Sequence, residues 1–322
     1  MTSDTPRPRR FGFILVEGYP LMSTAAAVEP LRAANLLSGQ ALYDLRFLSL
    51  DGEEAHASVG ALFRTAPIAQ AGTGFDLVFV VAGGDPVGFR HRGLTACLRQ
   101  LAARGVPLGG ISGGAAILAE AGLLANRRFT VHWEHYDALQ ARSADYMMER
   151  RLFVIDRDRY SCAGGTAPLD MMHAIVAGEH GAALARRVSD WFIQTRIRPA
   201  DDPQRAAAES RYRLMNPCLA AAVELMESHL ADPLSLDQIA RLSGIGKRQL
   251  QRLFAAELGM SASAFYRGLR LDLAARLLTG TGLPLAEVAG ATGFSAVSHF
   301  VQAFAARHGQ TPARYRRTGA RG

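Results

Sequence analysis

The sequence predicts a two-domain protein: an α/β parallel-sheet sandwich with helices on both faces, followed by an all-α domain with two helix-turn-helix motifs. Three observations predict this organisation. Short apolar runs alternate with helical stretches over the first two thirds of the chain. A pattern of about fifty residues occurs twice in the last third. The chain has 322 residues, of which 49% are hydrophobic, and is therefore long enough for two cores.

Four apolar runs are the predicted strands of the first domain, at residues 11–16, 43–50, 75–82 and 106–111. Helices are predicted at residues 21–37, 90–104, 114–124 and 134–142, and a helix over 181–194 closes the domain. This alternation is typical of a parallel sheet covered on both faces, which binds ligands at the carboxyl ends of its strands. We place the domain at residues 11–195, after a flexible arm at residues 1–10 that has no hydrophobic period.

Two of the predicted strands end in glycine-rich turns. One leads to Gly84, and the other leads to Ser112 and a helix. Gly110-x-Ser112-x-Gly114 matches the nucleophile-elbow pattern, in which a sharp strand-to-helix turn exposes a serine hydroxyl above backbone N–H groups. The N–H groups of Ser112 and Gly113, with Gly84 opposite them, suit a carboxylate at the positive end of a helix. The same glycines are equally typical of a turn that is only closely packed.

A second group of candidate residues lies between residues 130 and 134. His132 is the best candidate for a general base beside Ser112, and the alternative is a hydrogen-bonded residue in the wall of the domain. Trp133 and Glu134 combine an aromatic ring with a carboxylate, which suits a quaternary ammonium group. The alternative for Trp133 is a core aromatic residue at a helix start.

The last third of the chain contains one pattern twice. Residues 236–245 align with residues 285–294 at an offset of 49, and residues 250–265 align with 300–315 at an offset of 50. Two copies indicate a duplicated motif rather than a solenoid. Between them, apolar residues from 271 to 278 predict a connecting helix. Such a rod is expected to hold two recognition helices about 34 Å apart, the length of one DNA turn.

Each copy has the pattern of a helix-turn-helix. In the first, Leu236, Ile239, Ala240 and Leu242 predict the apolar face of a short helix before a break at Gly244. The second helix of each copy combines a buried stripe with a presented face. Polar and basic side chains on that face are types that reach phosphates and base edges in the major groove. Eight residues are predicted to contact DNA: Lys247, Arg248, Gln251 and Arg252 in the first copy, and Val297, Ser298, His299 and Gln302 in the second.

Positive charge is concentrated in the same part of the chain. Residues 210–322 contain 14 Lys and Arg against 7 Asp and Glu, which equals the whole formal charge of +7, so residues 1–209 are neutral. A basic half is also typical of an ordinary solvated surface, but together with the duplicated motif it predicts a polyanionic partner. Residues 196–216, with two prolines and mixed charge, are the predicted linker. The all-α domain is placed at residues 217–318.

The three cysteines, Cys97, Cys162 and Cys218, are widely spaced and predict neither a disulfide framework nor a zinc site. We therefore expect a reducing, cytoplasmic location, with no metal and no cofactor. Cys162 is expected to be a small buried thiol, and Thr166 to cap the helix that begins near residue 167. No run approaches ~18 uninterrupted apolar residues, so no membrane-spanning segment is expected.

Residues 236–317 resemble the DNA-binding domain of AraC-type transcription regulators. The resembling residues are Ile-Ala-x-Leu-Ser at 239–243, Arg-Gln-Leu-Gln-Arg-Leu-Phe at 248–254, Gly-Phe at 293–294 and Gly-Gln-Thr-Pro-x-x-Tyr-Arg at 309–316. The resemblance implies a regulator that binds double-stranded promoter DNA, activates transcription through RNA polymerase and forms a homodimer through its first domain.

Residues 11–195 resemble the class I glutamine-amidotransferase-like fold of the PfpI type, and more closely the ligand-sensing domains of one subgroup of AraC-type regulators. The resembling segments are 28–32, 83–84, 109–114, 130–134 and 162–170. Related sensors respond to glycine betaine, carnitine or arginine, so the resemblance implies a small zwitterionic effector. The predicted ligand-binding residues are Gly84, Ser112, Gly113, His132, Trp133 and Glu134.

Two departures from enzymes of this fold favour a sensor. Such enzymes place a cysteine thiolate at the elbow, where this sequence has Ser112, whose hydroxyl is a poor nucleophile without a dedicated base. They also carry an acidic residue after the first strand, near the position of Ser23. The sequence therefore predicts no catalytic residue and a regulator that is not an enzyme. The alternative is an amidase or hydrolase that uses Ser112 and carries its own DNA-binding domain.

Overall fold

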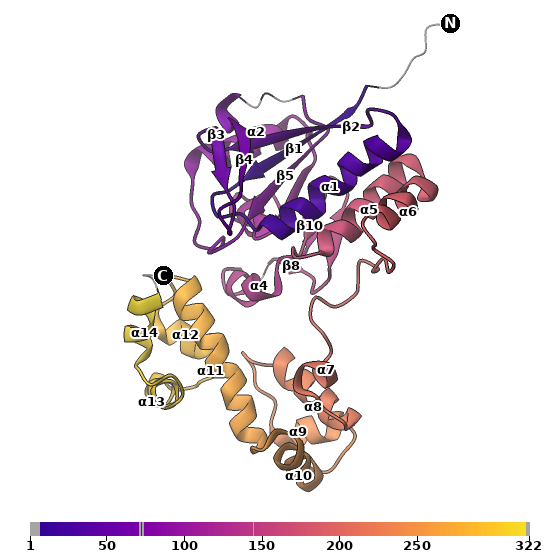
Figure 1. The fold of residues 1–322 in the computed structure, drawn as a ribbon. Helices are drawn as coiled ribbons and strands as arrows, with labels where there is room; N and C mark the ends of the chain where they lie inside the picture. Colours follow the sequence, from indigo (N-terminus) through magenta and orange to yellow (C-terminus); the bar gives the residue numbers. More distant parts are fainter. Residues whose placement is uncertain (1–6, 71, 73, 144, 320–322) are drawn as a thin grey trace, which may run out of the picture. The chain divides into compact units, whose positions relative to one another are not determined.

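The computed structural model describes residues 7–70, 72, 74–143 and 145–319. The chain divides into two compact units, Met1–Gln204 and Arg205–Gly322 (Figure 1). The first unit is a mixed sheet with helices on both faces, and the second is built of helices. The predicted fold class, an α/β domain followed by an all-α domain, is confirmed.

The main sheet of the first unit has the strand order β3-β4-β2-β1-β5-β6-β10-β9. The inner strands pair in parallel, whereas the outer pairs, β3 with β4 and β9 with β10, are antiparallel. Strand β5 is buried along its whole length, as expected for the centre of a sheet covered on both faces. The strands are β1 (Arg9–Leu15), β2 (Tyr43–Ser49), β3 (Glu53–His56), β4 (Leu62–Pro67), β5 (Leu77–Ala82), β6 (Leu108–Ser112), β9 (Phe153–Asp156) and β10 (Arg159–Cys162), with the separate short pair β7 (Arg128–Phe129) and β8 (Met147–Met148).

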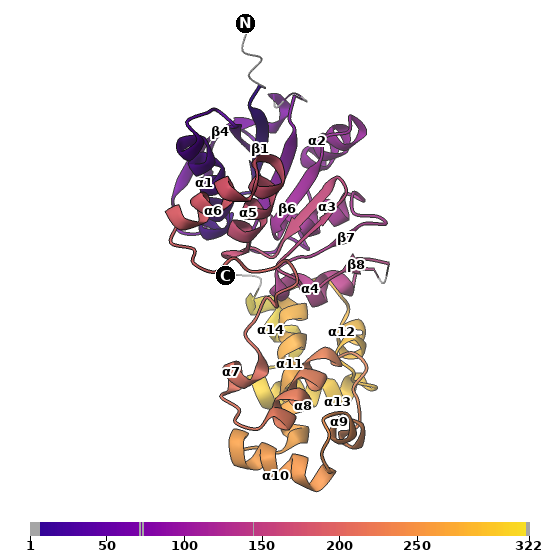
Figure 2. The ribbon, with the colours of Figure 1, turned by 90° about the vertical axis from the view of Figure 1, so that its right-hand side faces the viewer.

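Helices cover both faces of this sheet. Helices α1, α5 and α6 pack on one another over one face, and α2 and α3 lie on the other (Figures 1 and 2). Each helix predicted for this unit is present within a few residues of its predicted bounds. The helices are α1 (Leu21–Ser38), η1 (Ile68–Gln70), α2 (Arg92–Ala103), α3 (Gly114–Glu120), α4 (Trp133–Gln140), α5 (Ala167–His180) and α6 (Ala182–Trp191).

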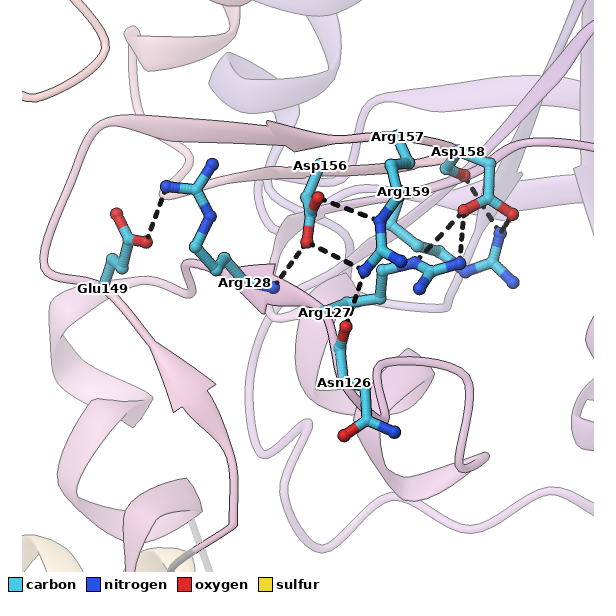
Figure 3. Close-up of polar contacts among 8 residues, drawn as sticks. All are labelled: Asn126, Arg127, Arg128, Glu149, Asp156, Arg157, Asp158 and Arg159. Atoms are coloured by element: carbon cyan, nitrogen blue, oxygen red, sulfur yellow. Dashed lines mark hydrogen bonds and ion pairs between the residues drawn. The ribbon is translucent and has the colours of Figure 1, made fainter.

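The turn between β9 and β10 is tied to the loop before β7 by charged side chains (Figure 3). Asp158 pairs with Arg127 at 3.0 Å and with Arg159 at 2.7 Å. A carboxylate oxygen of Asp156 accepts a hydrogen bond from the Arg128 backbone N–H at 2.9 Å. These contacts hold an outer hairpin that the sequence did not predict, because its two strands have only four residues each.

A segment after the last helix, residues 194–204, closes the first unit. The buried carboxylate of Asp170, which is 1% exposed, accepts hydrogen bonds from the Arg198 backbone N–H at 2.8 Å and from the Arg198 guanidinium at 2.6 and 3.0 Å. Gln194 Nε2 donates to the same carboxylate at 2.9 Å. The prediction that Thr166 caps α5 is wrong, because its hydroxyl makes no cap and accepts from Arg198 at 2.9 Å.

The last residue of this closing segment, Gln204, is also hydrogen-bonded to the first unit. Its Nε2 donates to Thr130 Oγ1 at 2.9 Å, to the Val131 carbonyl at 3.0 Å and to the Arg151 carbonyl at 2.8 Å. Residues 196–204 of the predicted linker therefore pack on the first unit. Residues 208–212 of the same range form a short helix of the second unit.

The predicted arm at residues 1–10 falls partly outside the described residues, because the structure is described from residue 7 onward. Arg7 pairs with Asp76 at 2.7 Å, and strand β1 begins at Arg9. Arg10 pairs with Asp44 at 2.8 Å. Residues 7–10 are therefore attached to the sheet.

The second unit contains two helix-turn-helix motifs around a central helix, α11 (Ala262–Gly280). The first motif is α9 (Leu236–Leu242) with α10 (Lys247–Leu258), and the second is α12 (Leu285–Ala291) with α13 (Val297–His308). At 19 residues, α11 is about 28 Å long. Three further helices complete the unit: α7 (Ala208–Tyr212), α8 (Pro217–Ser228) and α14 (Pro312–Gly319).

The prediction that Leu242 belongs to the apolar face of α9 is wrong. Leu242 is 62% exposed, whereas Ser243 is buried. Position 243 lies one further helical period from Ile239, on the same face, so it points inward even though its side chain is polar. Its hydroxyl is satisfied by the Ile239 carbonyl at 2.7 Å.

Among the residues that the structure describes, no helix is both long and apolar enough to span a membrane.

Candidate functional site

The predicted elbow is present between β6 and α3. Ser112 ends the strand with φ of 57°, a left-handed conformation that is uncommon for residues other than glycine. It is 7% exposed, and its hydroxyl has no hydrogen bond to any described residue. A side chain held in this conformation at the end of a central strand is typical of a functional turn.

Three glycines around Ser112 allow the turn to pack closely. A Cβ atom on Gly110 would lie 2.3 Å from the Ala115 nitrogen, and one on Gly114 would lie 1.9 Å from the Val80 carbonyl oxygen. A Cβ atom on Gly113 would lie 2.5 Å from Pro86 Cγ. The elbow therefore packs directly against β5 and the loop that follows it.

The expected role of the Gly113 N–H needs correction. This group donates to the Ala82 carbonyl oxygen at 2.9 Å, so it is already used within the protein. The sharp turn brings Gly113 so close to the end of β5 that its N–H can bond to the last carbonyl of that strand. Gly113 can line a site beside Ser112, but its N–H is not a free donor for a carboxylate.

Two positions named by the enzyme-fold resemblance, Ser112 and Ser23, both contact the glycine turn after β10. A Cβ atom on Gly164, in the turn after β10, would lie 2.7 Å from Ser112 Cβ. The next backbone N–H, that of Gly165, donates to Ser23 Oγ at 2.8 Å. Ser112 thus packs on Gly164, and Ser23 is hydrogen-bonded to Gly165 of the same turn. Burial raises the pKa of the neighbouring Cys162 thiol to about 12, so this cysteine is protonated at neutral pH.

The second group of predicted residues forms the first turn of α4. His132 is the N-cap residue, and its Nδ1 accepts the Glu134 backbone N–H at 3.3 Å. The ring centroids of His132 and Trp133 are 5.3 Å apart, and those of His132 and His135 are 5.7 Å apart. Trp133 is partly exposed and Glu134 is exposed. An aromatic group with an adjacent carboxylate is what a bound cation requires.

Two residues that sequence reasoning did not select connect this turn to the loop after β5. Burial, together with the neighbouring His132, lowers the pKa of His135 to about 4, even though Glu134 and Asp85 act to raise it. Asp85 follows Gly84, which has φ of 62°. The α4 turn is thus within electrostatic range of Asp85 in the loop after Gly84. The same loop packs on the elbow through Pro86. No hydrogen bond joins His132 to Ser112 in the described part of the chain.

We expect the His135 ring to titrate near pH 4 and to be neutral at pH 7. Replacing Asp85 with asparagine removes a charge that raises this pKa, so the titration midpoint should move lower. The pKa of His135 is about 4 in the folded protein and about 6.5 in the unfolded chain. The neutral ring therefore contributes its full stability above pH 6.5, and this contribution is lost as the pH falls from about 6.5 to about 4. Ring-proton NMR of the wild type and Asp85→Asn would measure both midpoints. A wild-type midpoint near 6.5 would contradict the assignment.

The eight predicted DNA-contacting residues are all exposed on the two recognition helices. On α10 the buried residues Leu250 and Phe254 turn the polar face outward, and on α13 Phe300 and Phe304 do the same. Lys247 pairs with Asp237 at 2.8 Å in an exposed ion pair, which is weak and easily exchanged for a phosphate. Contact of these residues with DNA stays a prediction.

Replacing Arg252 with alanine is expected to weaken specific DNA binding by ~1 to 3 kcal/mol if the guanidinium reads a base edge. The loss should depend on the base opposite Arg252. Fluorescence anisotropy on a duplex selected from a random pool, and on its single-base variants at several salt concentrations, would measure it. Arg314→Ala, at an exposed arginine of α14, is the control for charge removal alone. Unchanged affinity at every salt concentration would remove Arg252 from the interface.

The sequence is similar to those of known proteins over nearly its whole length. Residues 13–178 match the DJ-1/PfpI family, and residues 239–318 match a helix-turn-helix domain. The chain is 42% identical to the HTH-type transcriptional regulator GlxA of Rhizobium meliloti, over 98% of each chain. It is 40% identical to the HTH-type transcriptional regulator CdhR of Pseudomonas aeruginosa, over 95% of this chain and 91% of that relative.

A solved structure supports the same comparison for part of the chain. The AraC family transcriptional regulator from Pseudomonas putida is 30% identical, with a TM-score of 0.54. The match covers 57% of this chain and all of that one.

Proposed function

Because the chain belongs to the HTH-type transcriptional regulators that join a DJ-1/PfpI domain to an AraC-type helix-turn-helix domain, we propose that its first unit senses a small zwitterion. The protein is a DNA-binding transcription regulator. The observation that carries the sensor proposal is the elbow, a strained and closely packed turn whose serine has no hydrogen-bonded histidine among the described residues.

Three features of the first unit support sensing rather than catalysis. The elbow residue is Ser112, and no described histidine is hydrogen-bonded to it. Cys162 is buried, and burial raises its pKa to about 12. The Gly113 N–H, which an oxyanion would need, is bonded to the backbone. An elbow turn that carries serine in place of the enzymes' cysteine is best explained as part of a binding site.

The proposed ligand-binding residues are Gly84, Ser112, Gly113, His132, Trp133 and Glu134, with Asp85 and His135 beside them. Trp133 and Glu134 suit the cationic end of a zwitterion. Because the Gly113 N–H is already used, the Ser112 hydroxyl at the N-terminal end of α3 is the group proposed to bind its carboxylate. This division of roles favours a quaternary amine or an amino acid over a neutral metabolite.

The experiment is a thermal-shift titration of the full chain with glycine betaine, carnitine, dimethylglycine, arginine and uncharged analogues. A ligand at 100 times its dissociation constant should stabilise the protein by ~2.7 kcal/mol. Trp133→Ala should abolish the shift while leaving the unliganded melting temperature within a few degrees. Saturation by an uncharged analogue alone would reject the zwitterion.

The alternative, a hydrolase that uses Ser112, is tested with the same compounds. Turnover of a bound compound that disappears in Ser112→Ala would reject the pure sensor. Binding without turnover in both proteins would support it.

We further propose that Gln204 carries the response toward the second unit. Its side chain is hydrogen-bonded to Thr130 and Val131, which directly precede His132, and it is the last residue of the first unit. A ligand that moves the α4 turn would act on these bonds, and must favour one arrangement of the linker to have an effect. A homodimer through the first unit, contact with RNA polymerase during activation and a cytoplasmic location are proposed from the family alone.

A further inference from the structure

The two helix-turn-helix motifs meet at a junction that lies beside the middle of α11. Tyr266 and Arg270 are one helical turn apart and therefore lie on the same face of this helix. The Tyr266 hydroxyl donates to the His229 carbonyl and accepts from the Leu234 N–H at 3.2 Å. Both partners belong to the loop between α8 and α9, so Tyr266 holds the entrance to the first motif.

Arg270 holds the second motif in the same way. Its Nε donates to the Thr292 carbonyl oxygen and its Nη2 to the Gly293 carbonyl oxygen, both at 2.7 Å. These carbonyls end α12 and form the turn before the second recognition helix. The guanidinium carbon also lies 4.3 Å from the centroid of the Phe294 ring. One side chain thus fixes the turn by two hydrogen bonds and a cation–π contact.

The two loops held by Tyr266 and Arg270 also pack on each other. Gly293 has φ of 71°, and a Cβ atom there would lie 2.4 Å from Pro233 Cγ and 2.9 Å from the Leu230 carbonyl oxygen. Backbone of the second motif therefore lies directly against the α8–α9 loop of the first. The two motifs are joined by this contact as well as through α11.

The far end of the second recognition helix is attached to α11 as well. Arg307 of α13 pairs with both carboxylate oxygens of Asp272, at 2.7 and 2.8 Å. A Cβ atom on Gly268 would lie 3.0 Å from Arg307 Nη1, so the guanidinium lies close to the backbone of α11. Helix α13 is consequently held near its start through the Arg270 turn and near its end through Arg307.

We propose that the junction of Tyr266, Arg270, Gly293 and Pro233 sets the spacing of the two DNA segments that the protein recognises. The inference rests on the proposed docking of both α10 and α13. Inserting one base pair between the two segments turns the second by ~34° and moves it by about 3.4 Å along the duplex. A rigid junction cannot follow this change, so a wild-type chain must lose the contacts of one helix.

The experiment uses the full chain and a duplex that the wild-type protein selects from a random pool. Footprinting on this duplex defines the two protected segments. Duplexes with one base pair inserted or removed between these segments are then compared with the original. The spacing ratio is the dissociation constant for the altered duplex divided by that for the original duplex. We expect a ratio of about tenfold or more for the wild type. Arg270→Ala should bind the original duplex more weakly and show a ratio of roughly two to three, because the second motif is freed.

Three further variants separate positioning from general damage. Arg270→Lys keeps the charge and one donor and should restore part of the wild-type ratio. Pro233→Ala removes the ring that Gly293 contacts and should lower the ratio without removing any charge. Arg267→Ala, at an exposed position on the same helix, should keep the wild-type ratio. Circular dichroism melts establish that each variant is folded.

The outcomes distinguish the two proposals. Two protected segments with an unchanged ratio in folded Arg270→Ala and Pro233→Ala would overturn the junction proposal and leave two-helix docking intact. A wild-type footprint over one segment would overturn both. If Arg270→Ala does not fold, the Pro233→Ala ratio decides.

Discussion

Replacing Asp170 with asparagine is expected to destabilise the first unit by roughly 3 kcal/mol. The carboxylate is buried and accepts four hydrogen bonds, three of them from Arg198. Asparagine keeps the shape but leaves the guanidinium without its counter-charge, and breaking a buried pair costs about 3 to 5 kcal/mol. The lower end of this range applies because the Arg198 side chain is 32% exposed.

The measurement is urea unfolding followed by tryptophan fluorescence. Trp133 and Trp191 are the two tryptophans of the chain, and both belong to the first unit, so the signal reports that unit. Glu29→Gln is the matched control, because it breaks an exposed pair with Arg32 and should change stability by less than ~0.5 kcal/mol. An equal effect of the two substitutions would mean that the closing segment adds no stability.

Replacing Gly114 with alanine is expected to cost about 3 kcal/mol or more. The new methyl group would lie 1.9 Å from the Val80 carbonyl oxygen and 2.7 Å from its carbon. Both atoms belong to the backbone of the central buried strand, which cannot move without disturbing the sheet on either side. The elbow must then shift, so ligand binding should be lost as well.

Thermal unfolding monitored by the same fluorescence should show a decrease of about 6 °C or more for Gly114→Ala. Gly178→Ala is the control for the glycine-to-alanine change itself. Gly178 lies in α5, is exposed and has no atom within 4 Å of a Cβ position, so alanine should stabilise the helix slightly. Similar melting temperatures for the two variants would show that the elbow can adapt.

The inner part of the fold could be predicted from the sequence because the buried positions there are occupied by apolar residues at the spacing of a strand or a helix. Runs such as residues 77–82 are apolar throughout, and helices alternate with them. The outer strands β3, β4, β9 and β10 were missed because they are short, and each of them carries at least one charged residue, as in Glu53–His56. Ser243 was missed because the partner that satisfies its buried hydroxyl is visible only in the folded helix.

The candidate site was predicted where local pattern defines it and missed where tertiary proximity does. The elbow follows from glycine spacing around Ser112, since only glycines fit the contacts with Ala115 and Val80. Asp85 and His135 belong to different segments, and only the folded unit brings the Asp85 carboxylate close enough to affect the pKa of the His135 ring. The use of the Gly113 N–H by Ala82 likewise depends on how closely two strands end together.

The closing segment also has a consequence for the order of events during synthesis. Domains fold as units from the N-terminus while the chain is being made. Here the buried carboxylate of Asp170 can form its ion pair only once Arg198 has been synthesised. Thr130 likewise can accept its hydrogen bond only once Gln204 has been synthesised. The first unit can therefore complete these hydrogen bonds only after residue 204 has left the ribosome, so its folding depends on residues that directly precede the DNA-binding unit.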